Sequence, residues 1–175
     1  MHSIHATFDS GNIELLEQSA EQIQLAIRLD AGEDHYQWFH FRVSGRAPCE
    51  LVITNAKGAS YEGGWPDYRA CASYDRDHWF RVPTRYEDGR LIIEHAPEAD
   101  VVWYAYFAPY DYERHQRLIG WAQGFEGVDY EVLGSSVDGR PMDLLSVGET
   151  GFKLESSVDT AATTVLPTDA AAAAA

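Results

Sequence analysis

Histidine and carboxylate side chains lie close together in one stretch of the sequence and raise the question of a metal site. His95 and Glu98 are three positions apart, and His115 follows farther along the chain. Zinc binds such side chains when they converge at about 2 Å from one point, together with a third ligand. Pro97 favours an extended backbone at Ala96, and in an extended segment positions i and i+3 face opposite sides, about 10 Å apart. A tight turn would bring them together, but we expect a loop between two strands here.

Other residues that could do chemistry lack the spacing that known mechanisms require. The chain has no Gly-x-Ser-x-Gly elbow for a nucleophile and no Gly-rich loop for phosphate. Carboxylates gather at Asp75, Asp77, Glu87 and Asp88, and in so acidic a chain we interpret them as solvated surface. Exposed aromatic rings on a sheet could stack on sugars, which keeps an alternative function open. The aromatic residues considered are Trp65, Trp79, Trp103, Tyr104, Tyr106 and Tyr110.

Length and charge limit the class of protein. A chain of 175 residues with 45% apolar and 13% aromatic residues can bury a core without disulfides or metals. Its formal charge of −15 repels phosphate backbones and anionic lipid, and no basic patch offsets it, so we expect neither a nucleic-acid nor a membrane partner. The amino terminus does not resemble a signal peptide, so we expect a soluble, cytoplasmic protein with Cys49 and Cys71 reduced.

Alternation of apolar and polar residues predicts many short strands, and hence a mainly β fold, an antiparallel β-sandwich with one short helix. Ile23, Leu25, Ile27 and Leu29 share one strand face. In the next strand Phe39, Phe41 and Val43 lie opposite Trp38, His40 and Arg42. Strands are expected at residues 12–17, 23–29, 38–43, 49–55, 79–83, 91–94 and 101–107.

One helix and a later hairpin complete the expected elements. Asp111 is placed to cap a helix that Gly124 ends, with Tyr112, His115, Leu118, Ile119 and Ala122 on one side. Two more strands are expected at residues 129–137 and 142–147. Beyond Glu149 the sequence is rich in Ala, Ser and Thr. We therefore expect a β-sandwich domain at residues 1–127, a second domain that begins at 128–149, and a low-complexity tail at 150–175.

Five short motifs occur in order along the sequence: Asp9-Ser10-Gly11-Asn12, Trp38-Phe39-His40-Phe41-Arg42-Val43, Tyr61-Glu62-Gly63-Gly64, His78-Trp79-Phe80-Arg81-Val82 and Tyr104-Ala105-Tyr106-Phe107-Ala108-Pro109-Tyr110. This order resembles a known family, the amino-terminal domain of cytosolic zinc carboxypeptidases, which are carboxypeptidase A-like metallopeptidases. The resemblance covers roughly residues 6–148. Its last part, residues 133–141, looks like the opening hairpin of the α/β carboxypeptidase domain.

The resemblance implies a β-sandwich packed against a peptidase domain that removes carboxy-terminal residues, with related members preferring acidic ones. It also implies zinc held by His-x-x-Glu and a distant histidine. That pair should follow the Gly139-Arg140 hairpin, whereas His95 precedes it and the Ala-rich tail comes next. We therefore expect no catalytic, cofactor-binding or metal residues in this chain, zinc only in the parent enzyme, and no activity of the chain on its own.

The resulting hypothesis is an accessory or folding domain of a zinc metallocarboxypeptidase. Its partners would be its own catalytic domain and, through that domain, a peptide substrate. The expected domain interface is the corner formed by Pro109, Tyr110, Asp111, Tyr112 and Arg114. Two alternatives remain open: a free-standing β-sandwich that binds glycan or peptide, and an independent metalloenzyme built on His95, Glu98 and His115.

Overall fold

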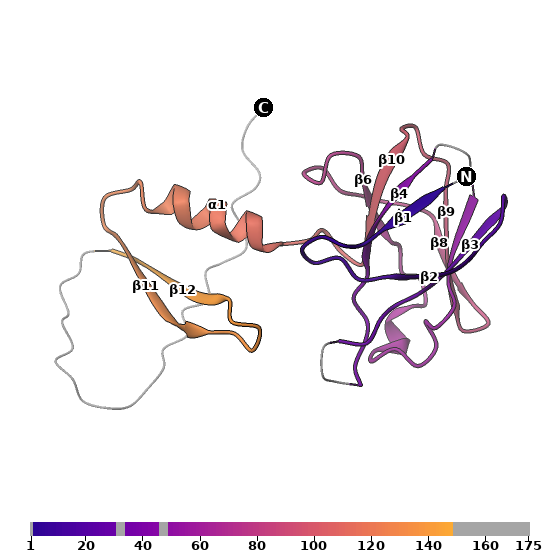
Figure 1. The fold of residues 1–175 in the computed structure, drawn as a ribbon, viewed down its shortest axis with the longest axis horizontal. Coiled ribbons are helices and arrows are strands. Elements are labelled where there is room, and N and C mark those ends of the chain that lie inside the picture. The colour runs from indigo at the N-terminus through magenta and orange to yellow at the C-terminus, as the bar shows by residue number, and fades with distance from the viewer. Residues whose placement is uncertain (1, 31–33, 46–48, 149–175) are drawn as a thin grey trace. The chain divides into compact units, whose positions relative to one another are not determined.

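Two five-stranded sheets make up most of the structure, a computed structural model that describes residues 2–30, 34–45 and 49–148. The chain divides after Gly120 into two compact units, which we describe one at a time (Figure 1). The first unit holds both five-stranded sheets and the beginning of the helix α1. The second holds a two-stranded hairpin. The expected domain boundaries stay a prediction, and the expected tail lies outside the described residues.

The chain passes back and forth between the two large sheets, so each sheet contains strands from the whole length of the first unit. The first sheet has the order β1-β4-β10-β6-β7 and the second has β2-β3-β5-β9-β8. In the first sheet the bounds are β1 Ser3–His5, β4 His40–Ser44, β6 Cys71–Ser73, β7 Phe80–Arg81 and β10 Val101–Ala105. In the second they are β2 Glu14–Gln18, β3 Gln22–Ala26, β5 Cys49–Ile53, β8 Thr84–Glu87 and β9 Arg90–His95. A short 3₁₀ helix, η1, spans Glu62–Gly64.

Nearly all neighbouring strands in these sheets are antiparallel, as expected. The exception is β3 with β5, which run parallel, with Ile23 opposite Leu51 and Leu25 opposite Ile53. Between β3 and β5 the chain forms β4 in the first sheet. It then returns to the second sheet, where β5 runs in the same direction as β3. The predicted antiparallel sandwich is confirmed, with this one parallel pair added.

Alternate side chains of the two sheets meet to form one core. Aliphatic residues of the second sheet, such as Leu25 and Ile93, pack with aromatic residues of the first, such as Phe41 and Tyr104. Phe41 is fully buried, and burying a side chain of this kind contributes about 1.5–3 kcal/mol. The predicted inward face of Phe39, Phe41 and Val43 is confirmed.

Some details of the strand predictions are wrong. β3 ends at Ala26, and Leu29, expected on the inner face, is 58% exposed because it lies beyond the ladder. His40, expected on the outer face, has no exposed surface, because the Phe8, Trp38 and Trp79 rings surround it. Three strands were not predicted because they are short or polar: β1, β6 and β8.

The helix α1, Tyr112–Ala122, begins where the sequence predicts. The Asp111 carboxylate accepts the Arg114 backbone N–H at 2.9 Å, which is the expected N-cap bond. On the predicted inner side Ile119 and Ala122 are buried, but Leu118 is exposed. No helix among the described residues is long and apolar enough to cross a membrane.

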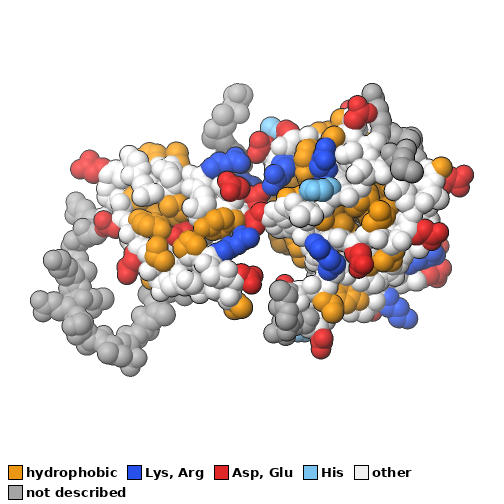
Figure 2. All heavy atoms as spheres, in the orientation of Figure 1, with side chains coloured by type: hydrophobic (Ala, Val, Ile, Leu, Met, Phe, Trp, Pro, Cys, Tyr) orange, Lys and Arg blue, Asp and Glu red, His pale blue; other side chains and the backbone are white. Residues whose placement is uncertain are grey.

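The second unit is built on the antiparallel hairpin of β11 (Val128–Ser135) and β12 (Pro141–Val147). A turn joins them, in which Gly139 adopts a positive φ of 78° and Ser136 N–H donates to the Arg140 carbonyl at 2.8 Å. Both expected strands are therefore present. Many apolar side chains of this unit are exposed, and Figure 2 shows hydrophobic groups gathered on its surface.

Candidate functional site

A tight turn near the amino terminus, Asp9-Ser10-Gly11-Asn12, forms one wall of the candidate site. The Trp38 indole N–H donates to the Ser10 carbonyl at 2.7 Å. A side chain at Gly11 would place Cβ only 2.1 Å from the Ala6 carbonyl oxygen, so the turn requires glycine here. The Asn12 amide donates to the Trp38 carbonyl at 3.0 Å. These bonds hold the turn against the start of β4.

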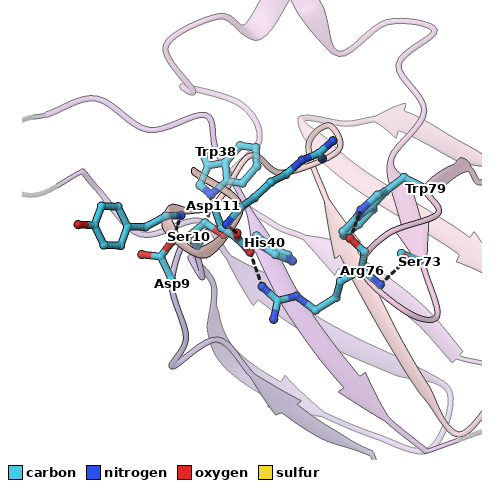
Figure 3. A network of polar contacts seen from close by, with 10 residues as sticks. Asp9, Ser10, Trp38, His40, Ser73, Arg76, Trp79 and Asp111 are labelled. Carbon is cyan, nitrogen blue, oxygen red and sulfur yellow. Dashed lines mark hydrogen bonds and ion pairs between the residues drawn. The ribbon is translucent and has the colours of Figure 1, made fainter. Parts of the chain in front are cut away.

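His40 lies at the centre of the site (Figure 3). Its Nδ1 is 2.9 Å from the Ser10 hydroxyl oxygen, whereas its buried Nε2 has no hydrogen-bond partner among the described residues. Burial and, to a smaller extent, the nearby Arg76 charge lower the pKa of His40 to about 4, against the opposing effect of the Asp111 and Asp9 carboxylates. The imidazole is therefore neutral near pH 7.

The loop after β6 brings Arg76 to the site. Ser73, itself buried, accepts the Arg76 backbone N–H with its hydroxyl at 2.8 Å, and Arg76 has a positive φ of 70°. The Arg76 guanidinium lies 2.5 Å from the Asp111 carboxylate and over the Phe8 ring. Asp111 in turn caps α1. One ion pair therefore joins the β6 loop to the beginning of the helix (Figure 3).

Asp75 stabilises the same loop rather than serving as an acid or base. Its carboxylate accepts the backbone N–H groups of Asp77 and His78, both at 2.8 Å, and lies 2.8 Å from His78 Nδ1. The hydrogen bonds from His78 and Asp77 hold the pKa of Asp75 well below its usual range. The same carboxylate raises the pKa of His78. Asp75 is thus ionised at all physiological pH values.

A second bond ties the amino-terminal turn to the helix. Asp9 accepts the Tyr112 backbone N–H with its carboxylate at 2.7 Å, across 103 positions of sequence. Asp9 and Asp111 together therefore satisfy two amide groups of the first helical turn, which otherwise have no partner within the helix.

A cavity of about 230 Å³ opens among these elements. Its walls come from the end of the sandwich and the first turns of α1. The lining residues are His40, Asp75, Arg76, Asp77, Trp79, Pro109, Asp111, Arg114 and Arg117.

The structure brings together some of the residues expected at a domain interface. Pro109, Asp111 and Arg114 line the cavity, with Pro109 buried. Tyr110 does not line it and is 55% exposed, with the Arg114 guanidinium 5.6 Å from its ring centre. Tyr112 is half-buried and lies against His115. Their role as an interface stays a prediction.

The expected loop between two strands is present at residues 96–100, which include Glu98, but His95 itself is the last residue of β9. The Nδ1 atom of His95 lies 2.8 Å from the Tyr104 hydroxyl, and its Nε2 atom lies 3.4 Å from the Tyr74 hydroxyl. Within the described ranges, no three histidine, cysteine or acidic residues are placed to hold a metal ion. The described residues therefore do not fit the zinc that the family resemblance implies.

Two of the aromatic residues considered for sugar stacking, Trp65 and Tyr104, have a structural role, whereas Tyr110 is exposed. Trp65 and Tyr104 are buried in the core, and the Trp65 indole N–H donates to the Ala56 carbonyl at 2.9 Å. Burial raises the pKa of the Tyr104 hydroxyl, which keeps it a neutral hydrogen-bond partner. Neither Trp65 nor Tyr104 is therefore available to a glycan-binding surface.

Sequence reasoning missed the central residues of the site. His40 was assigned only to an outer strand face and Arg76 to no role. A signal was present in the Asp9-Ser10-Gly11-Asn12 turn, since Asp and Asn side chains in turns readily form hydrogen bonds with backbone groups. The partner of that turn, 28 to 30 positions later, cannot be read from local spacing.

Known proteins resemble this chain along most of its length. The family model of the cytosolic carboxypeptidase N-terminal domain matches residues 4–107. Human cytosolic carboxypeptidase 6 is 31% identical over 165 residues, which cover 81% of this chain and 32% of the human protein.

Solved structures give the same result. A metallo-carboxypeptidase from Burkholderia cenocepacia is 41% identical with a TM-score of 0.81, over 84% of this chain and 40% of that one. A metallo-carboxypeptidase from Pseudomonas aeruginosa is 45% identical with a TM-score of 0.78, over 82% of this chain and 39% of that one. The chain therefore spans well under half the length of the relatives it matches.

Proposed function

Because the chain belongs to the family of cytosolic carboxypeptidase N-terminal domains, we propose that it is the accessory domain of a zinc metallocarboxypeptidase. The match of the family model over residues 4–107 carries this proposal, and the metallo-carboxypeptidase structures agree with it. The parent enzyme removes carboxy-terminal residues from peptides in the cytoplasm, acidic residues among them. Its zinc is held by residues other than those described here.

The accessory role is to pack against the catalytic domain and support its fold. The corner of residues 109–114 is suited to this, because a strand-to-helix corner projects the exposed Tyr110 ring and the Arg114 side chain outward. Aromatic and arginine side chains are enriched in protein interfaces. The ion pair between Asp111 and Arg76 fixes the corner on the sandwich, so that it is presented in one conformation.

The hairpin of β11 and β12 is the beginning of the catalytic domain in this proposal. Tyr130 lies opposite Leu145 and Glu131 opposite Leu144, so alternation places Leu145 on one face and Leu144 on the other. Apolar side chains on both faces are typical of a strand that is covered on both sides, as in α/β sheets. An isolated two-stranded hairpin is marginally stable in water, so further strands or helices should cover it.

The interface is tested by binding of this chain to the catalytic region of the Pseudomonas aeruginosa metallo-carboxypeptidase, produced separately. We expect saturable association in calorimetry, and a loss of affinity of about tenfold or more for the double variant Tyr110→Ala, Tyr112→Ala. Tyr61→Ala is the matched control, since Tyr61 is also an exposed tyrosine but precedes η1. Equal affinity of the double variant and the wild type would remove the corner from the interface.

A further inference from the structure

The cavity of about 230 Å³ has more hydrogen-bond donors than acceptors to match them. Both oxygens of Asp111 are engaged, one by the Arg114 backbone N–H and the other by the Arg76 guanidinium. The Asp75 carboxylate is occupied by its own loop and by His78. The acceptors built into the cavity wall are thus largely used to hold the wall itself.

Two guanidinium groups on the helical side have no carboxylate partner among the described residues, although that of Arg114 lies over the Tyr110 ring. Arg114 and Arg117 both line the cavity from exposed positions of α1, one turn apart. Within the described part of the chain, no ion pair joins either side chain to a carboxylate. Asp77 also lines the cavity, but it is exposed at the surface, where water screens its charge.

The third unused donor belongs to His40. Among the described residues, the Ser10 hydroxyl has one hydrogen-bond partner, His40 Nδ1 at 2.9 Å. If the hydroxyl donates to Nδ1, its hydrogen is satisfied and the neutral imidazole carries its own hydrogen on Nε2. Nε2 is buried without a partner, although buried polar atoms are nearly always paired. An N–H group at this position needs an acceptor that comes from outside the described residues.

We propose that this cavity binds a carboxylate group, with the Nε2–H of His40 and the guanidinium groups of Arg114 and Arg117 as donors. Guanidinium groups bind carboxylates through paired hydrogen bonds. The cavity is lined by three arginines and three aspartates, whose charges cancel, so the lining has no surplus positive charge to offset the double charge of phosphate. This site does not depend on the proposed function, because it rests only on the sandwich and the first turns of α1.

The test follows the Nε2 resonance of His40 by nitrogen NMR on the whole 175-residue chain with labelled histidine, assigned with His40→Gln. The probes are propionate and a blocked Gly-Glu-Gly peptide, compared at constant ionic strength with Gly-Gln-Gly and inorganic phosphate. We expect saturable shifts with the two carboxylates only. Tighter binding of the peptide would assign the carboxylate to a polypeptide side chain, and equal binding would assign it to a small molecule.

Variants identify the donors. The double variant Arg114→Gln, Arg117→Gln should weaken carboxylate binding by about tenfold or more, whereas Asp77→Asn should change it by much less, because water already screens the Asp77 charge. Arg85→Gln, on the strand β8 of the other sheet, is the control and should leave binding unchanged. Equal shifts with the glutamine peptide, tighter binding of phosphate, or a bare Nε2 would overturn the proposal. Unchanged spectra with every probe would show a cavity that holds water only.

Discussion

The sandwich and the hairpin are both built from strands, but their apolar side chains differ in burial. In the sandwich Phe41 and Leu25 have no exposed surface, because two sheets face each other. In the hairpin Leu133 is 61% exposed, and other apolar side chains of β11 and β12 are exposed as well. The strand pattern alone is therefore not a measure of stability, which depends on whether a second layer covers the strand.

The largest expected difference between the two regions lies in their response to a large-to-small substitution. Phe41→Ala should lower the free energy of unfolding by about 3–5 kcal/mol, because it leaves a cavity between the sheets. Leu133→Ala should change it by less than about 0.5 kcal/mol, since the side chain is already in water. Urea unfolding of both variants measures this. A similar loss in the two variants would mean that the hairpin is buried in solution.

The sandwich should also show its buried histidine in the pH dependence of its stability. The folded pKa of His40, about 4, is below the ordinary value of 6.5, so the unfolded chain takes up a proton between these pH values. Stability should be full above about pH 6.5 and should fall by up to about 3 kcal/mol as the pH approaches 4. The measurement is urea unfolding at pH 7 and 4.5.

His40→Gln provides the control for this pH effect. The variant has a different free energy of unfolding at pH 7. Its loss of stability between pH 7 and 4.5 should be smaller than that of the wild type, because the titrating group is gone. His95, whose pKa is lowered by burial, and His78, whose pKa is raised by Asp75, remain in both proteins and cancel in the comparison. An unchanged pH slope would place the proton uptake elsewhere.

A smaller effect is expected at the edge of the sandwich, where α1 begins. Asp111→Ala should cost about 1–2 kcal/mol, because it removes the N-cap bond to the Arg114 amide and the ion pair with Arg76. Asp111→Asn keeps the cap and loses the charge, so it should cost clearly less. Thermal or urea unfolding separates the two variants. Equal losses would assign the effect to the ion pair rather than to the cap.

The sequence predicted the elements that local patterns control. The alternation through Phe39, Phe41 and Val43 and the cap at Asp111 depend only on neighbouring residues, and both are found in the structure. The mainly β fold was predicted from the same alternation and the family from the order of short motifs, and the solved structures and the family model confirm them.

The candidate site could not be predicted in the same way. Its central contacts join Ser10 to His40 and Arg76 to Asp111, which are 30 and 35 positions apart. No local period reports such pairs, because they depend on which strands become neighbours. Burial of His40 on the nominally outer face is a further case, since it needs Phe8, Trp38 and Trp79 from three different segments.

The position of β10 in the first sheet has a consequence for the order of folding. β10 lies between β4 and β6 and pairs with both, yet it is the last of the sandwich strands along the chain. During synthesis the middle of this sheet therefore stays vacant until residues 101–105 have left the ribosome. Until then, the edges of β4 and β6 that pair with β10 remain unpaired. This favours slow, late closure of the sheet and makes chaperone binding most useful just before β10 inserts.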